Sequence, residues 1–130
     1  CIYYGTEICM EGGYDPDSRR CFDWEEMRWD KAVLEKIKTL IALKKEEILQ
    51  YGTIQIWEEN QMLVVQRTWK TSSITLWINE TDSTKEILRE QSHGTGVICA
   101  ENGLDGKGCK KGHLFLQSKG FVVVKEEMGV

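Results

Sequence analysis

The sequence predicts a mainly β fold: an antiparallel β-sandwich preceded by one long amphipathic helix. Before Gly52, one long segment places apolar residues three and four positions apart, whereas after Gly52 only short apolar runs separated by turn residues occur. Such runs, with turn signals about every 8–12 residues, favour an antiparallel sandwich over a parallel sheet. The 130 residues are enough for one compact domain, but a closed eightfold β/α barrel takes about 250.

The long helix is expected over residues 31–50, with Asp30 as its N-cap and Gly52 as its stop signal. One face forms an apolar stripe suited to burial, consisting of Val33, Leu34, Ile37, Leu40 and Ile41. The opposite face carries Glu35, Lys36, Lys38 and Lys45. Because this polar face mixes both charges, a helix that packs on a core is favoured over the alternative, a membrane-binding or partner-binding helix.

Six or seven short strands are expected after Gly52, at residues 53–58, 62–69, 73–79, 113–117 and 121–125, with the weaker patterns at 86–89 and 96–100. In the third strand, Ile74, Leu76 and Ile78 alternate with Thr75 and Trp77, which predicts two different faces. The last two strands are expected to form a hairpin through residues 118–120. The segment 102–112 has four glycines and three lysines and predicts a mobile hairpin loop.

The charge pattern excludes some classes of partner. The net charge is −4 with both signs well mixed, so neither nucleic acid nor an acidic membrane surface is expected to bind. No apolar run reaches the length of about 18 residues that a membrane-spanning helix needs.

The five cysteines form an odd, irregularly spaced set, which indicates reduced thiols in a cytoplasmic protein.

A zinc site is the alternative use of these residue types, since Cys99 and Cys109 are flanked by His93 and His113. Their spacing matches neither a Cys-x-x-Cys pair nor a His-x-x-x-His helix. We therefore favour an apolar Cys99 on a strand, a loop Cys109 and two surface histidines. No metal and no cofactor are predicted.

The first twenty residues contain the most specific pattern. Residues 1–7 are Cys-Ile-Tyr-Tyr-Gly-Thr-Glu, and residues 12–20 are Gly-Gly-Tyr-Asp-Pro-Asp-Ser-Arg-Arg. Residues 2–4 predict a brief buried strand that ends at Gly5. Because a strand begins at Cys1, with no initiator Met, we expect a chain cut inside a longer one.

This pattern resembles the end of the barrel in the alpha-amylase superfamily (glycoside hydrolase family thirteen). The most similar group contains the neopullulanases, cyclomaltodextrinases and maltogenic amylases. Their eighth barrel strand has a hydrophobic-Tyr-Tyr-Gly-x-Glu pattern, and a Gly-Gly-x-Asp-Pro-Asp-x-Arg-(Arg/Lys) loop follows. Phe22 and Trp24 stand in the aromatic region after this loop. Residues 40–45 resemble the family's Leu-Ile-x-Leu-Arg segment, with Lys44 in place of arginine.

The resemblance implies two parts. Residues 1–51 would be the end of the catalytic β/α barrel, comprising its last strand, a ligand-side loop and its last helix. Residues 52–130 would be the C-terminal antiparallel β-sandwich domain. Arg67, Asn79 and residues 114–125 match the places where such domains usually have an arginine, an asparagine and a final hairpin.

The resemblance also implies retaining hydrolysis of an alpha-glucan by a carboxylate nucleophile and a carboxylic general acid. In the family's order these residues precede the segment present here, and no Asp or Glu of this chain matches their motifs. We therefore assign no catalytic residue. Glu7, Asp15 and Asp17 match a strand-end glutamate and two loop aspartates, none of which is the acid or the nucleophile.

Two residues are predicted to bind substrate, because Asp15 and Arg19 match a loop pair that contacts distal glucose units in this family. A carboxylate and a guanidinium can each bridge two sugar hydroxyls. The alternative is a structural loop salt bridge, which contributes only about 0–1 kcal/mol when exposed. Ser18 stands where asparagine is common.

The five tryptophans raise the question of whether aromatic rings of this chain stack against sugars. Trp57, Trp69 and Trp77 lie on expected strands, where core or inter-domain packing is the commoner role, and Trp24 and Trp29 flank the helix start. An exposed aromatic pair that binds glucan on the surface is the alternative.

The sequence therefore predicts a structural, inactive C-terminal portion of an alpha-glucan hydrolase. Its partners would be the missing catalytic barrel and, in the parent enzyme, an alpha-glucan or maltooligosaccharide. Without the barrel, either the helix folds onto the sandwich or two copies bury their apolar surfaces as a homodimer. The alternative function is a non-catalytic carbohydrate-binding or interaction module.

Overall fold

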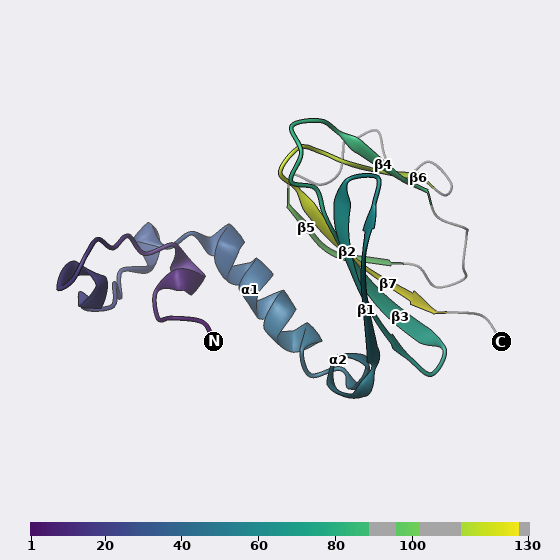
Figure 1. Ribbon diagram of the computed structural model, residues 1–130. Helices are drawn as coiled ribbons and strands as arrows, with labels where there is room; N and C mark the ends of the chain where they lie inside the picture. The colour runs from purple at the N-terminus through teal and green to yellow at the C-terminus, as the bar shows by residue number, and fades with distance from the viewer. Residues whose placement is uncertain (89–95, 102–112, 128–130) are drawn as a thin grey trace. The chain divides into compact units, whose positions relative to one another are not determined.

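The computed structural model describes residues 1–88, 96–101 and 113–127 of the chain (Figure 1). The chain divides into two compact units, Cys1–Ala42 and Leu43–Val130. Each unit is described separately below.

The first unit has little regular structure before its helix. Three short 3-10 helices lie at Thr6–Ile8, Asp17–Arg19 and Glu26–Arg28. The strand expected at residues 2–4 is wrong: the amide of Thr6 donates to the carbonyl of Tyr3 at 3.2 Å, and Gly5 takes a left-handed φ of 87°. The physical reason is that no strand in the described part of the chain pairs with these residues, and an isolated strand leaves its backbone groups unbonded.

Helix α1 (Lys31–Leu43) begins where the sequence predicts. The Asp30 carboxylate accepts from the backbone amides of Ala32 and Val33, both at 3.0 Å, so Asp30 is the N-cap. The expected apolar stripe is only partly covered. Val33, Leu34 and Ile37 are half-buried, whereas Leu40 and Ile41 are exposed.

The prediction of a single helix to residue 50 is wrong, because α1 ends at Leu43 and a second helix, α2 (Glu47–Tyr51), follows after three residues. Glu46 has an extended backbone, and its amide donates to the carbonyl of Leu43 at 3.0 Å. Leu43 and Ile48 are both buried in one cluster. On a straight helix, residues five apart point in directions roughly 140° apart. The break therefore lets both side chains face the same core.

The second unit contains seven strands among the described residues, which lie at the positions predicted. They are β1 (Thr53–Glu59), β2 (Met62–Trp69), β3 (Ser72–Ile78), β4 (Lys85–Leu88), β5 (Gly96–Glu101), β6 (His113–Leu116) and β7 (Phe121–Glu127). Five form a sheet in the order β1-β2-β3-β7-β5, and β4 pairs with β6 in a second sheet. All pairings are antiparallel, which confirms the predicted fold class.

The prediction that residues 113–117 and 121–125 form a hairpin is wrong. β6 pairs with β4, whereas β7 lies between β3 and β5, so the turn between β6 and β7 crosses from one sheet to the other. Leu116 of β6 and Val122 of β7 are both fully buried in the same cluster. As members of two different sheets they can meet face to face in this cluster, whereas a hairpin would place β6 and β7 side by side in one sheet.

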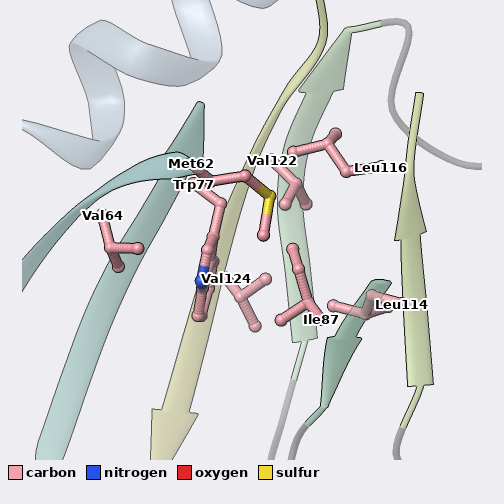
Figure 2. Packing of buried hydrophobic residues seen from close by; sticks show 8 residues of the cluster. All are labelled: Met62, Val64, Trp77, Ile87, Leu114, Leu116, Val122 and Val124. Carbon is pink, nitrogen blue, oxygen red and sulfur yellow. The ribbon is translucent and has the colours of Figure 1, made fainter. Parts of the chain in front are cut away.

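The main core fills the space between the two sheets (Figure 2). Its buried members come from β2, β3, β4, β6 and β7 and are Met62, Val64, Trp77, Ile87, Leu114, Leu116, Val122 and Val124. A second cluster combines the buried residues Leu43, Ile48, Ile74 and Val123. Ile74 and Trp77 thus lie in different clusters, as their alternation in the sequence predicts.

Arg67 on β2 fixes the end of α2 to the main sheet. Its two terminal nitrogens donate to the carbonyl oxygens of Gly52, at 2.5 Å, and Leu49, at 3.1 Å. The last carbonyls of a helix have no partner inside the helix, so a cation here satisfies them. This bond pair holds α2 beside the end of β2.

Candidate functional site

The two predicted substrate-binding residues lie together in the first unit. Arg19 Nε lies 2.6 Å from Asp15 Oδ1, and Arg19 Nη2 lies 3.0 Å from Asp15 Oδ2. This is a two-pronged pair in which the guanidinium plane and the carboxylate fix each other's orientation. The Asp15–Pro16 peptide bond is cis, and Arg19 lies in the 3-10 helix that follows. Both side chains are about two-thirds exposed, so their outer edges can reach a ligand.

Two tyrosines of the preceding segment hold the loop. The hydroxyl of Tyr3 donates to the carbonyl of Ser18 at 3.3 Å, and that of Tyr4 donates to the carbonyl of Arg20 at 2.7 Å. Their rings lie 4.6 Å apart between centroids. Burial, with the neighbouring Tyr3 hydroxyl, raises the pKa of Tyr4, so its hydroxyl keeps the proton that it donates.

A second carboxylate–guanidinium pair lies in the same loop and was not predicted. Arg20 Nε lies 2.9 Å from Asp17 Oδ1, and Arg20 Nη2 lies 2.5 Å from Asp17 Oδ2. The hydrogen bond from Arg20 lowers the pKa of Asp17, which stays ionised. A Cβ at Gly13 would lie 2.8 Å from an Asp17 carboxylate oxygen, so a side chain there would have to displace that carboxylate. The i, i+3 spacing of Asp17 and Arg20 was the available signal.

This arrangement suits binding rather than proton transfer. Asp15 and Asp17 are each held by a guanidinium on both carboxylate oxygens, so neither carboxylate is left open for proton transfer. Glu7 Oε2 is buried and has no hydrogen-bond partner in the described part of the chain. Both aspartates are therefore engaged in ion pairs with arginines of the same loop.

A depression of about 650 Å³ lies beside the loop in the same unit. Its aromatic wall is built by Phe22, Trp24 and Trp29, with the Phe22 and Trp24 rings 4.7 Å apart. The indole of Trp29 donates to the carbonyl of Asp23 at 2.7 Å, whereas Trp24 is 79% exposed. Arg20 lines the depression, which therefore adjoins the second ion pair.

The zinc alternative falls largely outside the described residues, since His93 and Cys109 and the side chain of Cys99 are not included. His113 Nδ1 lies 2.5 Å from Glu86 Oε1. Within the described ranges, no group of three or more His, Cys, Asp or Glu could hold a metal ion. No described helix is long and apolar enough to cross a membrane.

The chain is similar in sequence to part of several cyclomaltodextrinases and amylases. It is 32% identical over 126 residues to a cyclomaltodextrinase of Thermoanaerobacter pseudethanolicus, covering 95% of this chain and 21% of that protein. It is 35% identical over 97 residues to the intracellular maltogenic amylase of Bacillus subtilis, covering 69% and 16%. It is 29% identical over 99 residues to neopullulanase 2 of Thermoactinomyces vulgaris, covering 73% and 17%. No protein-family model matches.

The fold agrees with these similarities. The crystal structure of a maltogenic amylase from S. marinus aligns with a TM-score of 0.68 and 24% identity, covering 99% of this chain and 17% of that one. The sequence similarities, together with the fold, thus define a portion of an amylase-type glycoside hydrolase. The chain is homologous to part of the enzymes of the cyclomaltodextrinase, maltogenic amylase and neopullulanase group, and it spans about one fifth of the length of the curated relatives it matches.

Proposed function

We propose that the chain is a portion of a retaining alpha-glucan hydrolase and that Asp15 and Arg19 contact the glucan in the complete enzyme. The observation that carries this proposal is the similarity over 95% of the chain to a cyclomaltodextrinase. In this proposal, residues 1–51 are the end of the catalytic β/α barrel and residues 52–130 are the C-terminal domain. The chain alone is inactive.

The geometry of the loop supports sugar contact. Asp15 uses its two oxygens on Arg19 but each oxygen has a further lone pair, and Arg19 has donors beyond the two in the pair. A sugar with vicinal hydroxyls can therefore donate to Asp15 and accept from Arg19 at once. Because the pair is already formed, little side-chain entropy is lost on binding.

The neighbouring pair Asp17–Arg20 provides a matched control for this role. In the complete enzyme we expect Asp15→Ala and Arg19→Ala each to raise KM for maltodextrin by about tenfold, since a bond worth about 1.4 kcal/mol is lost. Asp17→Ala should raise KM less than twofold. Equal effects of the two pairs would contradict substrate contact by Asp15 and Arg19 and favour a loop-stabilising role.

Inactivity of the chain itself has a direct test. The purified chain should release no reducing sugar from maltodextrin, cyclodextrin or pullulan, because no Asp or Glu of the chain matches the motifs of the family's acid and nucleophile. Measurable release that survives repurification would overturn the inactivity.

We also propose a cytoplasmic location, supported by the Bacillus subtilis relative that is named intracellular.

A homodimer of the chain is proposed from the exposed apolar side chains of the first unit, including Ile2, Tyr3, Leu40 and Ile41. Light scattering at high concentration should give twice the monomer mass of 15.0 kDa. A monomer at all concentrations would contradict it.

A further inference from the structure

An exposed aromatic pair lies on the second unit, at the junction of α2 and β2. The rings of Tyr51 and Trp69 have their centroids 5.8 Å apart and are tilted by 44°. Tyr51 is 62% exposed and ends α2, whereas Trp69 is half-buried and ends β2. A large aromatic ring left in water beside a second ring is a surface that a partner or ligand can cover.

The pair is held in place by its neighbours. Glu47 lies one helical turn before Tyr51, so both point from the same side of α2. Glu47 Oε2 accepts from the indole Nε1 of Trp69 at 3.3 Å and from Lys70 Nζ at 3.2 Å. The hydrogen bonds from Lys70 and Trp69 lower the pKa of Glu47, which is therefore ionised. Lys70 Nζ also lies 5.6 Å from the centroid of the Trp69 ring.

A shallow depression of about 300 Å³ continues from Trp69. Its polar lining comprises Lys70 and Thr71 of the β2–β3 connection and Ser72 at the start of β3, together with Glu46, Glu47 and Lys125. Glu46 Oε2 and Lys125 Nζ are 2.5 Å apart. The site thus combines aromatic surface with hydroxyl, carboxylate and ammonium groups in one place.

The charges of this site select against an ionic ligand. Its two carboxylates and two ammonium groups are matched in two ion pairs, Glu47–Lys70 and Glu46–Lys125. An anion or a cation would have to break one of these pairs and would find no net charge in return. A neutral ligand with many hydroxyls and an apolar face fits better, since its hydroxyls can bond to the outer lone pairs and protons of groups already paired.

We propose that Tyr51 and Trp69, with Glu47 and Lys70, form a second glucan contact, on the β-sandwich unit and separate from the Asp15–Arg19 loop. The apolar face of a glucose unit lies on the exposed Tyr51 ring, and Trp69 supports that ring from the side. The choice of glucan as ligand rests on the proposed function. The site binds the substrate chain and takes no part in its hydrolysis.

The test uses the five tryptophan indole N–H signals of the 15N-labelled chain during titration with maltoheptaose. Trp69→Phe assigns the Trp69 signal by its disappearance. The Trp69 signal should shift and saturate, while that of the buried Trp77 stays in place. Tyr51→Ala should weaken binding about tenfold, which corresponds to about 1.4 kcal/mol. Tyr14→Ala, which changes a fully exposed tyrosine of the first unit, should leave binding unchanged.

Several outcomes would overturn the proposal. They are a Trp69 signal that does not move, equal effects of Tyr51→Ala and Tyr14→Ala, or a larger shift with inorganic phosphate than with maltoheptaose. If Tyr51→Ala perturbs the whole spectrum, Glu47→Gln replaces it and should weaken binding about threefold; unchanged binding would again overturn the proposal. The two proposals can also fail separately. If Asp15→Ala raises KM in the complete enzyme but the Trp69 signal does not respond to maltoheptaose, the second glucan contact is contradicted and the proposed function stands.

Discussion

The side-chain amide of Asn79 lies 2.9 Å from the carbonyl oxygen of Gln117, thirty-eight positions later in the chain. The same nitrogen lies 3.2 Å from the carbonyl of Leu116 and 2.8 Å from that of Ser83, and the Asn79 side-chain oxygen accepts from Thr81. The side chain is fully buried. One amide therefore fixes the turn that crosses from the second sheet to the main sheet.

Removing this amide should destabilise the second unit. Asn79→Ala leaves buried carbonyl oxygens without a donor, and each such loss costs about 1–3 kcal/mol. We expect the free energy of unfolding in urea to fall by about 3 kcal/mol. Thr84→Ala, at an exposed position before β4, should change it by less than about 0.5 kcal/mol. Equal effects would show that the amide network contributes nothing specific.

A methyl group at Gly52 should be far more damaging than one at Gly96. A Cβ at Gly52 would lie 2.3 Å from the carbonyl oxygen of Ile48 and 2.9 Å from that of Thr68, and backbone atoms cannot move aside easily. We expect Gly52→Ala to cost about 2–3 kcal/mol, measured by thermal unfolding. Gly96→Ala meets nothing within 4 Å and is the control. A Gly52→Ala protein as stable as Gly96→Ala would contradict the packing described.

Arg67 should stabilise the second unit through the carbonyls that it binds. Arg67→Met keeps the apolar stem but removes both donors to Gly52 and Leu49. The expected loss is about 1.5–3 kcal/mol, because bonds from a charged donor are worth more than neutral ones. Arg67→Lys offers only one compact donor group and should recover less than half of it. Urea unfolding measures both, and full recovery by lysine would contradict the two-pronged role.

Titration should reveal the Asp17–Arg20 pair. The pKa of Asp17 is lowered by Arg20, so the folded state binds a proton less readily than the unfolded state. This contribution to stability is present above the unfolded-state pKa of about 3.9, and it is lost as the pH falls through the lower folded-state value. NMR of the Asp17 carboxyl should show a higher pKa in Arg20→Ala. An unchanged pKa would rule out the pair in solution.

The sequence predicted the elements better than their partners. Asp30 was found because its cap depends only on the next three residues, and the strands were found because alternation is local. The break between Leu43 and Glu47 was missed because the local pattern is helical and only burial of Ile48 in the core opposes it. The β6–β7 turn was misassigned for a similar reason, since Asn79, which fixes it, is distant in sequence.

The residues of the candidate sites were likewise predicted only in part. Asp15 and Arg19 came from a family resemblance, and their side chains do meet. Asp17–Arg20 was overlooked although both residues were visible in one motif. Tyr51 and Trp69 lie eighteen positions apart on elements of different type, so no spacing rule could pair them.

The position of β7 has a consequence for synthesis of the protein. β7 is the last described strand along the chain, yet it lies inside the main sheet, with β3 on one side and β5 on the other. A nascent chain that stops before Phe121 leaves β5 without a neighbour in that sheet and β3 with a bare edge. β7 must therefore leave the ribosome before the main sheet can form completely. The sandwich then folds only after β7 has been synthesised.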